Sequence, residues 1–399
     1  MNVLMVLSLG FDRPGPSLHL LSAVMRGLAA RGDRVHVIQK LSGGDGPGIP
    51  PDVLDTGLVT TVGIDMPVVG KNNFVGRYAQ SLAYVRRAAK AMAGRYDLVY
   101  IHSCQTLAPL VRAARRRCPG AKVLVNVQDI FPLNAAAIGV MKKDGLPYRL
   151  FAGAQARAYR RADGIITLSR DMQEVLAGEG GRAIEVIPPW TYDDDLRAVP
   201  EAENRFLREH PELTGFFRVV YAGNIGQMQN VEIVLEAAGH LREREDICFV
   251  IVGGGARTEK LRQKAEDMGL PNVRFYPMQN ADRAVEVYSM AHVNLITLAP
   301  GVTRTAFPSK TAICCAVARP ILAAVDPGSH YASMIRGIPG TRSVPAGDAR
   351  AFAEAVTDLE AKKRDFCPEA RELYARELGM KNGVARHLAF FDQLKGDTT

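Results

Sequence analysis

Short apolar runs recur along this chain, and each is followed by a stretch of helix length that mixes apolar with charged residues. In the first half they fall near residues 2–9, 34–39, 97–103, 122–128, 163–168 and 184–187. A strand followed by an amphipathic helix is the repeating unit of a parallel sheet covered by helices. The sequence therefore predicts an α/β domain over residues 1–190.

A second series of the same kind follows, with strands expected near 217–222, 247–252, 273–276, 292–297, 320–324 and 341–344. The two series are separated by PPWTYDDDLRAVP (188–200), whose prolines and acidic run predict an interdomain hinge. We expect a second α/β domain over 191–380. The last segment, 381–399, should carry a helix from Lys381 to Leu394 that packs back on the first domain.

Two doubly wound domains with parallel sheets imply a cleft, and ligands in such folds bind beyond the carboxyl ends of the strands. One segment does not fit the alternation of strands and helices. Residues 41–58 contain four glycines and three prolines between positions 43 and 51, which predicts a mobile surface loop without regular structure.

The chain has no run of 18 apolar residues that could cross a membrane, and its opening MNVLMVLSLG lacks the basic start of a signal peptide. Its six cysteines form no C-x-x-C pair, which favours reduced thiols. We therefore expect a cytoplasmic protein.

The net charge of +8 is concentrated in the first half, where residues 1–190 carry 24 Lys and Arg against 14 Asp and Glu. This asymmetry predicts an anionic partner for that half. The charges gather on two helix faces and the segment between them: Arg112, Arg115, Arg116, Lys142, Lys143, Arg149, Arg157, Arg160 and Arg161. Aromatic residues for base stacking are scarce there, so the expected partner is an anionic membrane surface rather than nucleic acid.

Three segments offer polar groups at strand ends. After VVYAG, the turn NIGQMQN leads into a helix, and Gly223 and Gly226 would free backbone N–H groups for a phosphate. In FPSKTAICCAVARPILAA (307–324), Ser309 can cap a helix whose first turn holds Lys310, a cation suited to the same anion. A tight turn without a ligand and a solvated lysine are the structural alternatives.

The third segment is VNVQDIFP (125–132), where Gln128 and Asp129 leave a buried strand. A carboxylate at this place could orient a sugar hydroxyl or accept a proton, or it could cap a turn. His102 ends another strand and could be structural. The run Asp193–Asp195 contains the D-x-D of metal-dependent sugar transferases, but its position in the hinge favours a solvated loop, so no metal is expected.

Taken in order, VQDIFP, AYRRADGIITLSRDMQEVL, IPPWTYDD, YAGNIGQMQNVEIVLEAA, FVIVGGG, VRFYPMQ and FPSKTAICCAVARPILA resemble the retaining GT-B glycosyltransferases of family four. The branch they are most similar to builds bacterial surface polysaccharides such as O-antigen and capsule. The resemblance covers nearly the whole chain and is weakest over residues 41–75. It implies a GT-B fold of two Rossmann-like domains, with the nucleotide donor on the second domain and the acceptor on the first.

The resemblance also implies roles for individual residues. Lys310 would be catalytic on this resemblance, and Asp129, the titratable group nearest to Gln128, is the other catalytic candidate. Donor-binding positions would be Gly223, Asn224, Gly226, Gln227, Gln229, Gly254, Met278, Thr305, Phe307, Ser309 and Thr311. Acceptor-binding positions would be Gly15, His102, Gln128 and Asn134.

The chain departs from the broader family pattern at its charged positions. An Arg and a Lys in the glycine turn are replaced by Asn224 and Gln229, and a pair of glutamates by Thr305 and Ile313. A histidine after the 122–128 strand is replaced by Gln128. Lys310 and backbone amides are then left to stabilise a leaving diphosphate.

The expected activity is transfer of a sugar, with retention and without a metal or other cofactor, from a nucleotide-sugar, expected to be a UDP-sugar. The acceptor would be a lipid-linked glycan at the inner face of the membrane. Two alternatives stay open: a nucleotide-sugar epimerase of the same shape, and a non-catalytic nucleotide-sugar-binding subunit.

Overall fold

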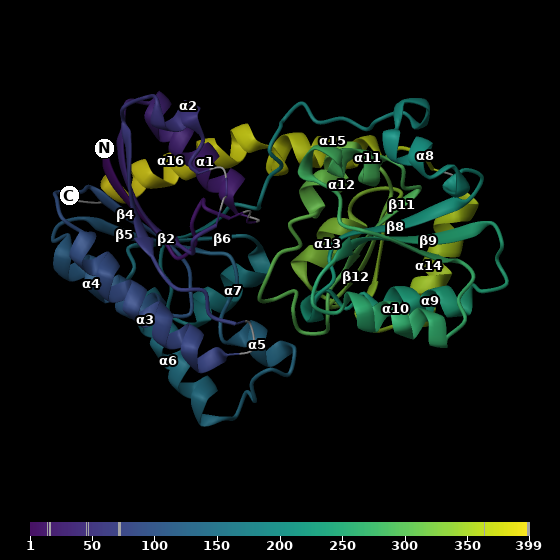
Figure 1. The fold of residues 1–399 in the computed structure, drawn as a ribbon, viewed down its shortest axis with the longest axis horizontal. Helices are drawn as coiled ribbons and strands as arrows, with labels where there is room; N and C mark the ends of the chain where they lie inside the picture. Colours follow the sequence, from purple (N-terminus) through teal and green to yellow (C-terminus); the bar gives the residue numbers. More distant parts are fainter. Residues whose placement is uncertain are drawn as a thin grey trace. The chain divides into compact units, whose positions relative to one another are not determined.

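The computed structural model describes residues 1–13, 15, 17–44, 46, 48–70, 73–362 and 364–396. Two residues of the loop expected over 41–58, Asp45 and Pro47, and residues 397–399 of the expected C-terminal segment lie outside this part. The chain forms two units (Figure 1). One comprises Met1–Tyr192, Thr305–Phe307 and the segment from Met380, and the other comprises Asp193–Arg304 and Pro308–Gly379.

The first unit is built on a seven-stranded parallel sheet in the order β3-β2-β1-β4-β5-β6-β7. Its strands are β1 (Asn2–Leu7), β2 (Arg34–Leu41), β3 (Val59–Asp65), β4 (Leu98–His102), β5 (Lys122–Val127), β6 (Gly164–Thr167) and β7 (Ile184–Val186). In the central strand β1, five of six residues are buried, because helices cover both faces of the sheet.

Helices cover both faces of this sheet (Figure 1). Each face has an apolar core of its own. One core holds residues of α3 (Phe74–Ala91), α4 (Leu107–Arg117), α6 (Leu146–Arg161) and α7 (Arg170–Gly178). The other holds residues of α1 (Leu18–Ala30), α2 (Pro51–Leu54) and α16 (Met380–Gly396). The short helix α5 (Leu133–Ala137) follows β5 and has no buried residue.

The C-terminal helix α16 is part of the first unit's core. Phe390, Phe391 and Leu394 are at most 5% exposed and pack with α1 and the sheet. Gly383 lets the helix lie against the Trp190 ring, because a methyl group added there would come within 2.1 Å of it. Residues beyond the hinge are therefore needed to complete the first unit.

Two predictions for residues 41–65 were wrong. The segment expected to lack regular structure begins with the last residue of β2 and contains the helix α2. The strand β3 was not predicted. It lies at the edge of the sheet, where only its first and sixth residues are buried, so its sequence lacks the apolar run of a central strand.

The second unit has a six-stranded parallel sheet in the order β10-β9-β8-β11-β12-β13. Its strands are β8 (Phe217–Asn224), β9 (Ile247–Gly254), β10 (Val273–Tyr276), β11 (Val293–Thr297), β12 (Ile321–Val325) and β13 (Arg342–Pro345). Its helices are α8 (Arg205–Glu209), α9 (Glu232–His240), α10 (Thr258–Asp267), α11 (Ala284–Ser289), α12 (Thr311–Val317), α13 (His330–Arg336), α14 (Ala349–Lys362) and α15 (Pro368–Leu373). An apolar core that includes residues of α9, α10 and α14 covers one face.

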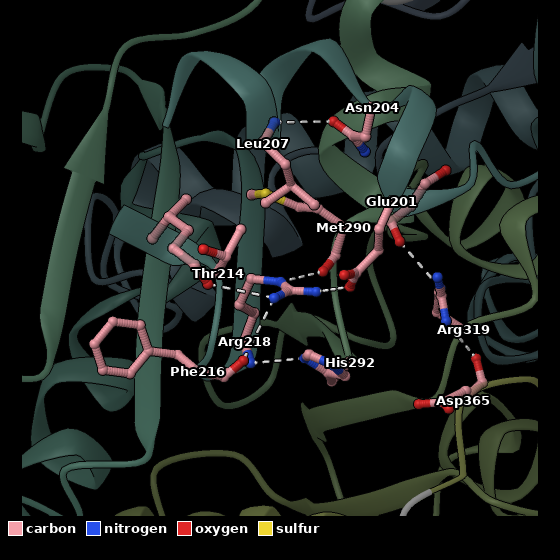
Figure 2. A network of polar contacts seen from close by, with 12 residues as sticks. Glu201, Asn204, Leu207, Thr214, Phe216, Arg218, Met290, His292, Arg319 and Asp365 are labelled. Atoms are coloured by element: carbon pink, nitrogen blue, oxygen red, sulfur yellow. Dashed lines mark hydrogen bonds and ion pairs between the residues drawn. The ribbon is translucent and has the colours of Figure 1, made fainter. Parts of the chain in front are cut away.

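Arg218 fixes the beginning of β8 (Figure 2). Its side chain is 2% exposed, donates from Nε to the Met290 carbonyl at 2.7 Å, and forms an ion pair with Glu201. Its backbone N–H donates to Nδ1 of His292 at 2.9 Å. Burial, with the neighbouring guanidinium, lowers the pKa of His292 to about 4, so the ring stays a neutral acceptor. The strand that leads into the glycine turn is thus anchored at its start.

Candidate active site

The glycine turn at the end of β8 lies against the end of β9. Gly223 pairs with Gly253, and Asn224 with Gly254, in the parallel register of the two strands. The Ile225 N–H donates to the Gly254 carbonyl at 2.9 Å. A methyl group added at Gly253 would come within 2.1 Å of the Gly223 carbonyl oxygen, so only glycine allows this approach.

Gly223 itself has φ of +130°, a backbone conformation that favours glycine. Beyond it, Asn224 donates from Nδ2 to Oε1 of Gln229 at 3.0 Å. The two neutral residues that replace family cations are thus joined across Gly226, where a methyl group would come within 2.6 Å of the Gln229 oxygen. Gln227 lies at the exposed start of this short 3₁₀ turn.

The helix after the turn begins within one residue of the place that the sequence predicts, directly after NIGQMQN (224–230). A 3₁₀ turn over Gln227–Gln229 and the left-handed Asn230 come first, and α9 begins at Glu232. Its first turn already holds a carboxylate, Glu232, which pairs with Arg257 at 2.6 Å. The groups available to an anion are therefore those of the glycine turn rather than the helix N-terminus.

Lys310 lies beside this turn. Its Nζ is 3.6 Å from the centre of the Tyr221 ring, and a methyl group added at Gly223 would lie 3.5 Å from it. Nζ is buried and has no hydrogen-bond partner among the described residues. Desolvation lowers the pKa of the ammonium group to about 7. Burial raises the pKa of the nearby Cys314 thiol to about 12, so that thiol does not neutralise the lysine.

A buried ammonium with no partner among the residues that the structure describes, held over an aromatic ring next to a glycine turn, is an arrangement suited to an incoming anion. Tyr221 was not predicted as part of the site. It lies two residues before Gly223 on the same strand, and this spacing puts both on one face of the sheet. That spacing was the signal that could have identified it.

The prediction that Ser309 caps a helix with Lys310 in its first turn was wrong. Lys310 is itself the residue before α12, no side chain caps this helix, and Ser309 is exposed. Thr311 is fully buried, donates to the Pro308 carbonyl at 2.6 Å and lies 2.8 Å from the Tyr331 hydroxyl. Its hydroxyl is therefore engaged inside the protein.

Gly254 and Met278 adjoin each other at the ends of β9 and β10. A methyl group added at Gly254 would lie 3.9 Å from Cβ of Met278, whose side chain is 51% exposed. The second unit thus contains most of the predicted donor-binding positions, together with the catalytic candidate Lys310. These positions are Gly223, Asn224, Gly226, Gln227, Gln229, Gly254, Met278, Ser309 and Thr311.

Thr305 and Phe307 lie with the first unit instead. The Ile130 N–H donates to the Thr305 carbonyl at 2.9 Å, and Asp129 forms an antiparallel bridge with Ala306. Phe307 packs against the core that contains β5. The structure therefore places these two residues beside Asp129, a catalytic candidate.

Asp129 begins no helix, since α5 starts four residues later. Its side chain keeps an exposed surface, while desolvation by the surrounding chain raises the pKa of its carboxyl. No hydrogen bond offsets this effect among the described residues. A carboxylate of this kind is able to accept a proton.

The acceptor-side candidates gather at the ends of β4 and β5. His102 is 7% exposed, its ring nitrogens have no side-chain or backbone partner within the described ranges, and burial lowers its pKa to about 4. The Gln128 side chain donates from Nε2 to Oδ1 of Asn126 at 2.7 Å. The backbone N–H of Gln128 donates to Oγ of Ser103 at 3.3 Å. Ser103 and Asn126 were not predicted, although both flank the strand ends that were.

The other two acceptor-side positions lie apart from this group in sequence and bonding. Asn134, in α5, accepts at Oδ1 from the N–H of Ala135 at 2.8 Å. Gly15 is exposed and precedes α1.

Comparison with known proteins agrees with this architecture. Residues 20–190 match the family described as "Glycosyl transferase 4-like domain", and residues 217–362 match "Glycosyl transferases group 1". The chain belongs to family four of the GT-B glycosyltransferases. The resemblance and the GT-B fold predicted from the sequence are confirmed.

Two curated relatives match this family-four chain at 27% identity. One is the "Probable glycosyltransferase WbjE" of Pseudomonas aeruginosa, matched over 63% of this chain and 62% of the relative. The other is the "Putative colanic acid biosynthesis glycosyl transferase WcaI" of Escherichia coli K12, over 63% of this chain and 68% of the relative. The match therefore spans less than two thirds of the first relative's length.

Among solved structures, Anabaena Alr3699/HepE in complex with UDP superposes with a TM-score of 0.72. Its identity is 15%, and the match covers 98% of this chain and 100% of that one. At this identity the likeness shows the fold alone.

Proposed function

We propose that this protein transfers a sugar, with retention, from a nucleotide-sugar, a UDP-sugar, to a lipid-linked saccharide acceptor in bacterial surface-polysaccharide synthesis. The observation that carries the proposal is Lys310, whose buried Nζ lies beside the Gly223 turn and has no hydrogen-bond partner in the described part of the chain. A diphosphate leaving group develops negative charge, and a fixed cation aimed at that charge stabilises the transition state. The name of WcaI, which refers to colanic acid biosynthesis, and the UDP bound by Alr3699/HepE support the substrate class.

The donor side needs few charged groups in this scheme. Asn224 and Gln229 are bonded to each other, and Lys310 is a cation that adjoins the glycine turn. The exposed Met278 next to Gly254 offers an apolar surface on which a base could lie. These features support binding of a nucleotide diphosphate in the second unit.

The acceptor side belongs to the first unit in this proposal. Asp129 offers a carboxylate with a raised pKa, and His102 and Gln128 offer polar groups at neighbouring strand ends. Asp129 would hold or deprotonate the acceptor hydroxyl.

We also propose that the reaction uses no bound metal. Among the described residues there is no group of three His, Cys, Asp or Glu side chains placed to hold one. The backbone of the Asp193–Asp195 run is fastened to the second unit, because the Tyr374 hydroxyl donates to the Asp193 carbonyl at 2.8 Å.

The protein would work at the inner face of the membrane. No helix in the described part of the chain has the length and apolar character to span a bilayer. Val140, which lies between α5 and α6, and Leu146 and Leu150 in the first part of α6 are between 63% and 67% exposed, however. Arg149 and Arg157 lie on the same side of that helix as the two leucines, which is the pattern of a surface that rests on anionic lipid.

The deciding experiment incubates the protein with a panel of radiolabelled nucleotide-sugars and membrane extract, with and without EDTA. Transfer to lipid-extractable material that persists in EDTA supports the proposal. Formation of an epimer would show an epimerase, and binding without turnover a non-catalytic subunit. Activity that EDTA removes and Mg²⁺ or Mn²⁺ restores would contradict the metal-free reaction.

A further inference from the structure

A large basic pocket opens in the first unit, away from every residue discussed above as catalytic or substrate-binding. Its volume is about 850 Å³, and its lining includes six arginines: Arg112, Arg115, Arg116, Arg160, Arg161 and Arg182. They come from the middle and the last turn of α4, from the last turn of α6 and from the segment before β7. The pocket therefore adjoins the amino ends of β5 and β6, whereas His102 and Gln128 lie at the carboxyl ends of β4 and β5.

The charge of this arginine pocket is not balanced by its lining. Asp163 is the one carboxylate that lines it, and its Oδ2 already accepts from Arg115 at 2.8 Å and from the Val123 N–H at 2.6 Å. Arg115 also donates to the Arg161 carbonyl at 2.6 Å. Asp163 thus fixes Arg115 in place, and no other acidic side chain among the described residues lines the pocket to balance the remaining arginines.

Four of the six guanidinium groups have no partner within the described part of the chain. These are Arg112, Arg116, Arg161 and Arg182. Each retains a planar set of donors that fits phosphate oxygens in pairs.

Helix-end electrostatics accounts for only part of this cluster. Arg115 and Arg160 donate to carbonyls near helix ends, as basic residues in a last turn commonly do. Arg112 lies in the middle of α4, and Arg182 lies on no helix, so neither serves a helix terminus. Because six arginines line one pocket, we expect an anion that contacts several of them at once.

We propose that the arginine pocket binds an anion that carries two or more phosphate groups. A single phosphate engages one or two guanidinium groups, whereas six arginines around a volume in the usual range of about 300–1,000 Å³ for ligand sites suit a larger polyanion. The same chemistry is present in free polyphosphate and in a lipid headgroup with two phosphates, so both sources enter the test.

The test measures binding of inorganic tripolyphosphate by calorimetry in about 0.15 M salt, where long-range attraction is screened. Excess UDP occupies the donor site. The variant Arg112→Ser/Arg116→Ser/Arg182→Ser removes three unpartnered donors. Arg117→Ser is the matched control, because Arg117 lies in the same last turn of α4 but does not line the pocket.

We expect the triple variant to lose about tenfold or more in affinity for tripolyphosphate, and Arg117→Ser to change it by less than about twofold. In a second arm, sedimentation with cardiolipin and phosphatidylcholine vesicles tests the lipid source. Loss of cardiolipin binding in the triple variant alone assigns the pocket to a headgroup, and loss of tripolyphosphate binding alone assigns it to a free anion.

Equal behaviour of the triple variant and Arg117→Ser in both arms would overturn the proposal. Melting temperature reports whether the variants are folded, and all three substituted side chains are exposed. Should the triple variant unfold, Arg182→Ser alone carries the same test, with a smaller loss expected and no loss overturning the proposal.

Discussion

The Lys310 side chain is subject to two opposed effects. Its buried surroundings disfavour the charged ammonium form, while the proposed diphosphate leaving group would require that form. The ammonium group faces the Tyr221 ring and has no hydrogen-bond partner among the described residues. Loss of a fixed cation that stabilises a leaving group typically costs a factor of about 10² or more in kcat. We expect this loss for Lys310→Ala in steady-state kinetics with the UDP-sugar that the panel identifies. The exposed Lys260→Ala is the control and should leave kcat unchanged.

The same residue predicts how stability depends on pH. In the folded protein burial lowers the pKa of Lys310 to about 7 from its ordinary value of 10.5. Between these two values the unfolded chain binds more protons, so the free energy of unfolding should gain a positive contribution as pH rises from 7 towards 10.5. Below pH 7 the contribution should be flat, since both states are protonated.

Urea unfolding at pH 7, 8 and 9 checks this prediction. Lys310→Met keeps the length of the side chain and removes the titrating group, so its stability should rise less steeply over that range than the wild type's. Identical slopes for the two proteins would show that Lys310 does not titrate in this window.

Asp129 permits a sharp separation of catalytic from structural roles. Asp129→Asn preserves volume and deletes the charge, and no helix depends on this side chain for a cap. We expect kcat to fall by about 10²-fold or more, as for loss of a general base, while UDP affinity and melting temperature stay close to the wild type's. A lower melting temperature with unchanged turnover per folded molecule would instead identify a structural residue.

The carboxyl ends of the strands β8 and β9 lie very close together. A methyl group at Gly253 would overlap the carbonyl of Gly223. Gly253→Ala should therefore destabilise the second unit by about 1–3 kcal/mol and weaken UDP binding, because the strand ends must separate. Gly178→Ala is the control, since its added methyl meets no atom within 4 Å in the described structure. Denaturant unfolding and UDP titration measure both effects.

Helix α16 offers a second prediction at this scale. Phe391 is 1% exposed and meets the Tyr100 ring edge to face at 6.0 Å. Phe391→Ala should cost about 3–5 kcal/mol of the first unit's stability, because the cavity lies in a core that includes the central strands. The neighbouring Gln393→Ala, on the exposed side of the helix, should change little. Equal stability of the two variants would show that α16 does not pack in the apolar core of the first unit.

Elements buried on both sides were predictable from the sequence, because their strands are continuous apolar runs such as that of β1. The edge strand β3 was not, since exposure removes the constraint that makes such a run necessary. The candidate site was also predictable only where it had a local sequence signal. Glycines and Lys310 were visible as a motif, but the placement of Lys310 over Tyr221 joins residues 89 positions apart and depends on tertiary structure. The crossing of Thr305–Phe307 to the first unit had no local signal either.

For the molecule as a whole, the exposed leucines of α6 predict a partner larger than a substrate. Vesicles containing phosphatidylglycerol should retain the protein, and retention should weaken steeply as salt passes about 0.15 M, where the Debye length is about 8 Å. Leu146→Ser/Leu150→Ser should reduce retention in co-sedimentation. The control is Val68→Ser, an exposed residue of the same unit at 63%. Equal recovery with neutral and anionic vesicles would contradict a membrane role for this face.

The path of the chain has a consequence for biosynthesis. The first unit takes its last helix from the segment that begins at Met380, and it also takes Thr305–Phe307 from the middle of the second unit's sequence. On the ribosome, the N-terminal half emerges early but lacks the helix that covers one face of its sheet. The second unit, whose sheet and helices lie between Asp193 and Gly379, can close first. Order of synthesis and order of completion are thus reversed, and the nascent first unit carries an uncovered apolar face until translation has passed Phe391.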